Sequence, residues 1–85
     1  MGNIIEEIRQ YILSQFLPGE RRENLQDDTP LLTGGIVDSV GMLRLIGFIE
    51  QRFGIEVGSH DATRDNFERI QDIVAFVESK RTMRK

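Results

Sequence analysis

The sequence predicts an all-α fold, a bundle of three longer helices and one short helix. Apolar residues recur at three- and four-residue spacing near residues 3–16, 39–53 and 69–81, which is the spacing of one face of an α-helix. Alternation of apolar and polar residues, the mark of a strand, never extends beyond a few positions. The length of 85 residues is enough for one domain and too short for two. We therefore expect a single domain over residues 1–85.

The first helix is expected over residues 3–16. Asn3 is a good N-cap because its side-chain oxygen can accept from a free N–H group in the first turn, and Glu6 follows at the capping-box position. Pro18 and Gly19 then end the helix. Its apolar face consists of Ile4, Ile5, Ile8, Ile12 and Phe16.

Residues 17–37 are expected to form a long connection, because proline and glycine recur there and the apolar periodicity is lost. A loop of this length inside a small domain usually has a function or is fastened to the rest of the fold. Its apolar residues are the expected anchors onto the helices, namely Leu25, Leu31, Leu32 and Ile36.

A glycine-rich turn, Gly34-Gly35, leads into a second helix over residues 39–53. Asp38 is its expected N-cap, because a carboxylate there can accept from the free N–H groups of the first turn. Ser39 then occupies the first helical position, where its hydroxyl points into solvent near the positive end of the helix. A phosphate ester at this position would lie beside unpaired N–H groups. The position suits a serine that another enzyme modifies, whereas a serine nucleophile would need a base that the sequence does not show.

Two apolar lines run along the second helix. The second line, Val40, Leu43 and Gly47, starts beside Ser39. Two interpretations of this second line stay open: it forms a partner-docking surface, or the helix is buried on two sides in the bundle. Gly41 and Gly47 each cost about 1 kcal/mol relative to alanine in a helix interior, which indicates close approach of a partner or of a neighbouring helix. The first line has the core pattern and consists of Met42, Leu45, Ile46, Ile49 and Phe53.

The remaining chain completes the bundle. Gly54 is expected to end the second helix. A short third helix is expected near Asp61–Asn66, capped by Asp61 or Ser59, and Phe67 follows as a core residue. The last helix is expected over residues 69–81, with frayed ends at residues 1–2 and 82–85. Its apolar face consists of Ile70, Ile73, Val74 and Val77, with Phe76 flanking it.

The composition limits the possible chemistry and partners. The absence of cysteine excludes disulfides, a thiolate nucleophile and a cysteine-based zinc site. The formal net charge is −3, but residues 80–85 carry four basic and no acidic side chains, which leaves seven basic against fourteen acidic side chains elsewhere. An acidic body disfavours nucleic acid and anionic membranes as partners and favours basic proteins. The basic end complements the dipole of the last helix.

Targeting and assembly signals are also missing from the sequence. Glu6 and Glu7 interrupt the N-terminal stretch, which argues against a signal peptide. The longest uncharged apolar run, from Leu45 to Ile49, is far shorter than a membrane span. No heptad repeat or large apolar patch demands an oligomer. We therefore expect a cytoplasmic monomer that does not enter membranes.

Other candidate sites are weak. His60 is the only histidine and lies in a polar loop, so we interpret it as a solvated side chain. Asp27 and Asp28 precede Thr29-Pro30 and are typical of turn caps more than of a cation site. The Gly34-Gly35 pair lacks the Lys-Ser/Thr that follows in a phosphate-binding P-loop. The sequence therefore predicts neither an enzyme nor a metal site.

The stretch Gly35-Ile36-Val37-Asp38-Ser39-Val40 resembles the attachment motif of the acyl carrier protein and peptidyl carrier protein superfamily. Valine stands here where leucine is commoner in that motif. The likeness covers nearly the whole chain, and its further segments are Asp28-Thr29-Pro30-Leu31, Phe53-Gly54-Ile55-Glu56-Val57, Asn66-Phe67 and Ile70-x-x-Ile73.

The resemblance implies a four-helix bundle of acyl-carrier-protein type with a long loop between helices one and two. It also implies that a phosphopantetheinyl transferase moves 4′-phosphopantetheine from coenzyme A onto Ser39. The arm would bring a thiol to a chain that has no cysteine. Acyl or aminoacyl groups would be loaded by a ligase or transferase, carried as thioesters and passed to downstream synthase enzymes, for fatty acid, polyketide or other specialised biosynthesis. A helical interaction module without a prosthetic group is the alternative.

By the same resemblance, Ser39 is the attachment site and Asp38 both caps the helix and contacts the transferase. The expected docking face consists of Val40, Leu43, Arg44 and Gly47. Carriers of fatty acid synthesis usually have a strongly acidic second helix, whereas the formal charge from Asp38 to Phe53 is zero here. We therefore expect a stand-alone carrier of a specialised pathway. Whether an acyl pocket opens between helices two and four, lined by Leu45, Ile49 and Val74, stays open.

Overall fold

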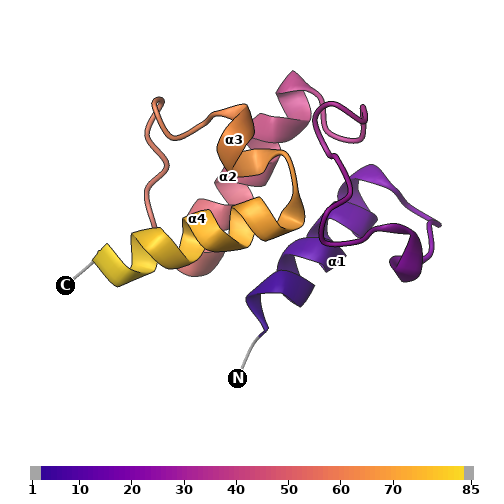
Figure 1. Ribbon diagram of the computed structural model, residues 1–85, viewed down its shortest axis with the longest axis horizontal. Helices are drawn as coiled ribbons and strands as arrows, with labels where there is room; N and C mark the ends of the chain where they lie inside the picture. Colours follow the sequence, from indigo (N-terminus) through magenta and orange to yellow (C-terminus); the bar gives the residue numbers. More distant parts are fainter. Residues whose placement is uncertain (1–2, 84–85) are drawn as a thin grey trace.

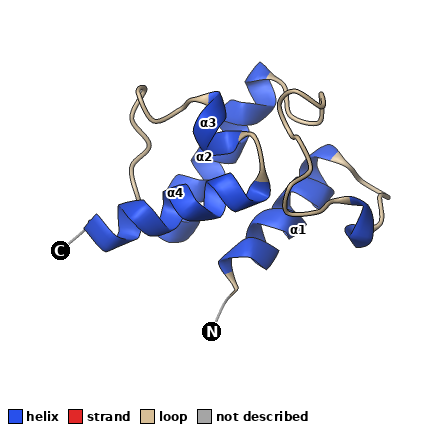
Figure 2. Cartoon of the chain, in the orientation of Figure 1, coloured by secondary structure: helices blue, strands red, loops and turns tan. Residues whose placement is uncertain are grey.

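The computed structural model describes residues 3–83, and every regular element in that range is a helix (Figure 2). The predicted all-α class with three longer helices and a short one is therefore confirmed. A one-turn 3₁₀ helix, which the sequence did not predict, lies in the first loop. The elements are α1 (Ile4–Phe16), η1 (Arg22–Asn24), α2 (Ser39–Phe53), α3 (Arg64–Phe67) and α4 (Ile70–Met83).

Helix α4 lies at the centre of the arrangement, because it contacts α1, α2 and α3. Figure 1 shows α4 crossing in front of α2, with α1 beside them and the short α3 above. The described residues measure 39 × 29 × 19 Å along their principal axes. Within residues 3–83, no helix combines the length and the apolar character needed to cross a membrane.

The core is built from the apolar faces that the spacing predicts. Phe67, the predicted core residue between the last two helices, is fully buried and packs 5.5 Å from the ring of Phe76. Phe76 is itself buried, so it belongs to the core and does not merely flank it. The residues with no exposed surface from the three longer helices are Ile8, Ile12, Leu45, Ile49, Ile70, Ile73 and Val77.

The long loop is fastened at several points. Leu25 and Leu31 are buried as predicted, whereas Leu32 and Ile36 are half-buried. Val37, which the sequence did not identify as an anchor, is also buried. Each leucine brings one half of the loop against the helices, so the segment has a defined path despite its low content of regular structure.

Three sequence predictions need correction. The third helix begins at Arg64 after the N-cap residue Thr63, not near Asp61. The Asp61 carboxylate cannot cap that helix, because it accepts from Gly58 N at 3.1 Å and from Lys80 Nζ at 2.9 Å. Helix α4 continues to Met83, past the predicted end at residue 81. The predicted frayed ends at residues 1–2 and 84–85 lie outside the described residues.

The first helix shows the third difference. Asn3 caps α1 as predicted, and its Oδ1 accepts from Ile5 N at 3.1 Å. Glu6 does not complete a capping box, because its carboxylate pairs with Arg22 and with Arg9. The same carboxylate therefore ties the first loop to α1.

Candidate functional site

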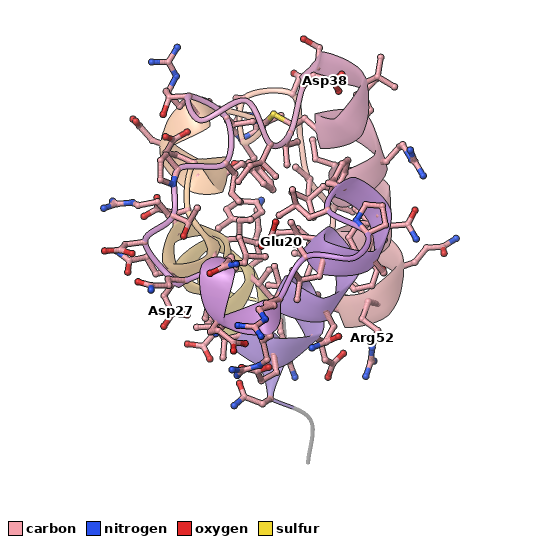
Figure 3. The ribbon with its side chains drawn as sticks, turned by 90° about the vertical axis from the view of Figure 1, so that its right-hand side faces the viewer. Glu20, Asp27, Asp38 and Arg52 are labelled. Atoms are coloured by element: carbon pink, nitrogen blue, oxygen red, sulfur yellow. The ribbon has the colours of Figure 1, made fainter. Side chains whose placement is uncertain are left out.

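The start of α2 has the geometry that the sequence predicts. Asp38 is the N-cap in an extended conformation, and its Oδ1 accepts from Gly41 N at 2.7 Å. Its carbonyl accepts the first intrahelical bond, from Met42 N at 2.8 Å. Figure 3 shows Asp38 at one end of α2 and Arg52 near the other. The cap fixes Ser39 as the first helical residue.

Ser39 is exposed, as are its neighbours. Val40 is 66% exposed and Leu43 is 70% exposed, and these are large apolar side chains in a protein that buries most others. Their exposure overturns the alternative in which α2 is buried on two sides. Arg44 and Gly47 of the predicted docking face are also exposed. The structure thus brings the predicted attachment residue and docking residues onto one accessible side of α2.

A tight turn delivers the chain to this site. The carbonyl of Leu31 accepts from Ile36 N at 2.9 Å and from Val37 N at 3.0 Å, and Leu32 O accepts from Gly35 N at 3.2 Å. Gly35 has a φ of +80°, a left-handed conformation that favours glycine. At Gly34 an added Cβ would lie 2.3 Å from the carbonyl oxygen of Pro30. The two glycines therefore close a tight turn before α2.

The two glycines of α2 differ in their surroundings. A Cβ at Gly41 would lie 2.6 Å from Cε1 of Phe16, so α1 approaches α2 closely there. Nothing lies within 4 Å of a Cβ built at Gly47. Close approach of a neighbouring helix thus explains Gly41, whereas Gly47 faces open space beside the predicted docking residues.

The cations of α2 are held in different ways. Arg52 forms an ion pair with Glu7 of α1 at 2.5 Å, so its charge is compensated within the fold. Arg44 donates from Nη2 to the neutral amide oxygen of Gln15 at 2.8 Å and lies 6.0 Å from the ring centre of Phe16. Glu50 is the acidic residue within α2, and its carboxylate accepts from the backbone N–H of Val57 at 2.8 Å. The exposed side of α2 therefore presents apolar surface and a positive charge.

An open groove of about 540 Å³ lies between α1 and α2, which sequence reasoning did not predict. Its floor includes Tyr11 and Phe48, whose rings stack at a centroid distance of 4.0 Å. The two aromatics occur in different helices, and only their packing brings them together. In contrast, Leu45 and Ile49, which were considered for an acyl pocket, have no exposed surface and pack in the core.

The weaker candidate residues have these surroundings in the fold, and for Asp27 they differ from the turn cap expected from the sequence. Asp27 Oδ1 pairs with Arg9 Nη2 at 2.7 Å, so this carboxylate fastens the loop to α1. The His60 side chain is 84% exposed in its loop, 3.5 Å from Asp61. Within residues 3–83, no three side chains of the metal-ligating types are grouped in a way that could hold an ion.

No protein-family model matches the chain. A probable acyl carrier protein, PigG of Serratia sp. (strain ATCC 39006), is 35% identical over 68 residues, which cover 80% of this chain and 77% of PigG. The chain belongs to the acyl carrier protein family. The resemblance found in the sequence is thereby confirmed. An acyl carrier protein of Solidesulfovibrio magneticus (strain ATCC 700980 / DSM 13731 / RS-1) is 25% identical over 79 residues, or 93% of this chain and 96% of that protein.

One solved structure adds a likeness in three dimensions. A chain in the crystal structure of an FAD-dependent dehydrogenase matches with a TM-score of 0.75 at 30% identity, over 82% of this chain and 97% of that chain. Members of the acyl carrier protein family carry acyl groups and are not enzymes, and they generally bear phosphopantetheine. This acyl carrier protein is therefore a carrier that works with transferase and synthase enzymes.

Proposed function

We propose that this acyl carrier protein is a carrier whose Ser39 bears 4′-phosphopantetheine. The observation that supports the proposal is the exposed serine directly after the Asp38 cap, at the head of a helix with an exposed apolar side. A phosphopantetheinyl transferase would form an ester between Ser39 Oγ and the phosphate of coenzyme A, removing the hydroxyl proton and releasing the adenosine bisphosphate portion.

The residues around Ser39 fit such a group. The first N–H groups of a helix have no intrahelical acceptor, and Asp38 takes only that of Gly41. The N–H groups of Ser39 and Val40 are therefore on the side where a phosphate is favoured by hydrogen bonding and by the helix dipole. The bound group supplies a terminal thiol that holds an acyl or aminoacyl unit as a thioester. The chain itself, which has no cysteine, supplies the attachment point and the surface that partners recognise.

The docking face supports a specialised pathway over housekeeping fatty acid synthesis. Basic partners are steered by an acidic surface, and steering depends on charges of opposite sign on the two proteins. Here Val40 and Leu43 offer apolar contact, and Arg44 would repel a basic partner surface. We infer that the cognate enzymes present an apolar recess beside neutral or acidic groups. Fatty acid synthase enzymes should use the loaded protein poorly.

The solved relative suggests one class of partner. The match covers 97% of a chain that is close to this one in length, and that chain occurs in the crystal structure of an FAD-dependent dehydrogenase. We infer that a flavin-dependent dehydrogenase can act on the group carried by this protein. Such a step would remove two electrons and two protons from the carried acyl group and reduce the flavin.

The first experiment measures intact mass after incubation with coenzyme A and a promiscuous phosphopantetheinyl transferase. The wild type should gain one phosphopantetheine, and Ser39→Ala should gain none. Ser79→Ala, which changes an exposed serine of α4, is the matched control and should be modified like the wild type. Circular dichroism checks that each variant is folded. An unmodified, folded wild type would remove the thiol arm and favour the interaction module without a prosthetic group.

A further inference from the structure

One carboxylate outside the attachment site holds the turn that leads to it. Glu68 lies at the junction of α3 and α4, and its Oε1 accepts from Leu32 N and Thr33 N, both at 3.1 Å. Its other carboxylate oxygen accepts from the Thr33 hydroxyl. The backbone carbonyl of Glu68 also accepts from Leu31 N at 2.7 Å. Figure 1 shows the magenta loop passing beside the orange α3–α4 junction.

Residues 31–33, which Glu68 binds, are connected to the attachment site by hydrogen bonds and by a short stretch of chain. Leu31, whose N–H is bound by Glu68, uses its own carbonyl to accept from Ile36 and Val37. Val37 is buried and is followed directly by the Asp38 cap and Ser39. A displacement of residues 31–33 would therefore be transmitted to the start of α2 through the two hydrogen bonds of the Leu31 carbonyl and through chain residues 34–38.

Burial alone does not hold this turn. Its ends are anchored because Leu31 and Val37 are buried, but Thr33, Gly34 and Gly35 between them are exposed. A glycine pair gives the backbone unusual freedom in the unclamped state. The hydrogen bonds to Glu68 therefore supply order at Thr33, just before the two glycines, that apolar packing does not supply there.

The Glu68 carboxylate is suited to this task because it is charged. The donated hydrogen bond from the Thr33 hydroxyl, with further support from the Thr33 and Leu32 N–H groups, lowers the pKa of Glu68 below its ordinary value, against an opposing effect of burial. It is consequently ionised at neutral pH, where it can only accept hydrogen bonds. Every group that it meets in the turn is a donor, so the match is complete.

We propose that Glu68 is a positioning residue for Ser39: it fastens residues 31–33 so that modifying and loading enzymes meet a preformed turn beside the serine. This inference rests on the proposed attachment at Ser39. If only a fraction of molecules has the turn in place, the apparent affinity of a partner falls by that fraction. Loss of the clamp should consequently raise KM more than it lowers kcat.

The test compares Glu68→Ala with wild type as substrates of a promiscuous phosphopantetheinyl transferase. KM should rise about fivefold or more, with kcat changed less than about twofold, since the competent fraction falls and the chemistry does not change. Glu68→Gln, which keeps an acceptor oxygen, should lie between the two. Amide hydrogen exchange should accelerate at Leu32 and Thr33 in Glu68→Ala and stay slow in the α4 core.

Two controls separate positioning from general destabilisation. Ile73→Val loosens the core of α4 without touching the turn and should keep the wild-type KM. Glu78→Ala removes an exposed carboxylate from the same helix and should also behave as wild type. A wild-type KM in Glu68→Ala, or an equal KM rise in Ile73→Val, would overturn the proposal. Failure of the wild type to be modified at all would instead refute the attachment at Ser39.

Discussion

The two glycines inside α2 lead to opposite predictions for the same substitution. Gly47→Ala places a methyl group in open space, because nothing lies within 4 Å of that Cβ position. Alanine is more favourable than glycine in a helix by about 1 kcal/mol, largely because it restricts the unfolded chain. In a domain of this size, we expect the free energy of unfolding to rise by about 1 kcal/mol and Tm to rise by about 4–8 °C.

Gly41→Ala gains the same helix propensity but meets two neighbours. Its Cβ would lie 2.6 Å from Cε1 of Phe16 and 3.1 Å from the capping oxygen of Asp38. The Phe16 ring cannot move without disturbing its edge contact with Tyr11, at a centroid distance of 6.2 Å. Overpacking costs about 1–3 kcal/mol and a weakened cap about 0.5–2 kcal/mol. After the helix-propensity gain of about 1 kcal/mol is subtracted, we expect a net loss of about 0.5–4 kcal/mol.

The assay is urea and thermal unfolding of the wild type and both variants. The loss of helix is monitored by circular dichroism at about 222 nm. The two midpoints should move in opposite directions from the wild type. Equal stabilisation by both substitutions would show that Phe16 yields freely, and the close α1–α2 approach would no longer explain Gly41. A neutral or destabilised Gly47→Ala would refute the open surroundings of that position.

Three further predictions concern the core and the loop fastenings. Ile49→Ala removes a fully buried side chain and should cost about 2–5 kcal/mol in urea unfolding; a cost below about 1 kcal/mol would contradict its central place in the core. Arg9→Ala should lower the free energy of unfolding by about 1–3 kcal/mol, because Arg9 donates to the Leu25 carbonyl and to Asp27. If Arg9 and Asp27 act as a pair, adding Asp27→Ala to this variant should lower it little further. The hydrogen bond from Lys80 lowers the pKa of Asp61, so its stabilising contribution is complete above the ordinary carboxyl pKa of about 4 and is lost as the pH falls through the lowered value. Asp61→Asn should therefore lose stability at pH values near 7 and show a shallower decline on acidification than the wild type, and parallel curves would refute this linkage.

The helices and their caps could be predicted because they depend on residues close together in sequence. Asn3 and Asp38 cap the predicted helices, and Gly54 ends α2 as its C-cap in the left-handed conformation. The third helix was misplaced for a reason that lies outside its own segment. The residues around Asp61 predict that it caps the third helix. In the fold, however, its carboxylate accepts from Lys80 of α4 and from the Gly58 N–H.

The candidate site was predicted in part for the same reason. The Asp38-Ser39 pair is a local signal, whereas the exposure of Val40 and Leu43 depends on where the other helices pack. The spacing alone left open whether α2 is buried on two sides. Arg9 is the opposite case, a charged residue that is buried. Its burial depends on the long loop, whose Leu25 carbonyl and Asp27 carboxylate accept from its guanidinium.

Much of the acidic excess of this carrier serves the fold. Asp27, Glu68 and Asp61 each fasten one connection: the first two hold the two halves of the long loop, and the third joins the α2–α3 loop to α4. Figure 3 shows Asp27 on the loop, away from the start of α2 that Asp38 marks. An acidic composition therefore does not imply an acidic docking face. Beside Ser39 the exposed side chains carry both signs, with Asp38 at the cap and Arg44 on the predicted docking face, so net charge alone does not give the charge of that surface.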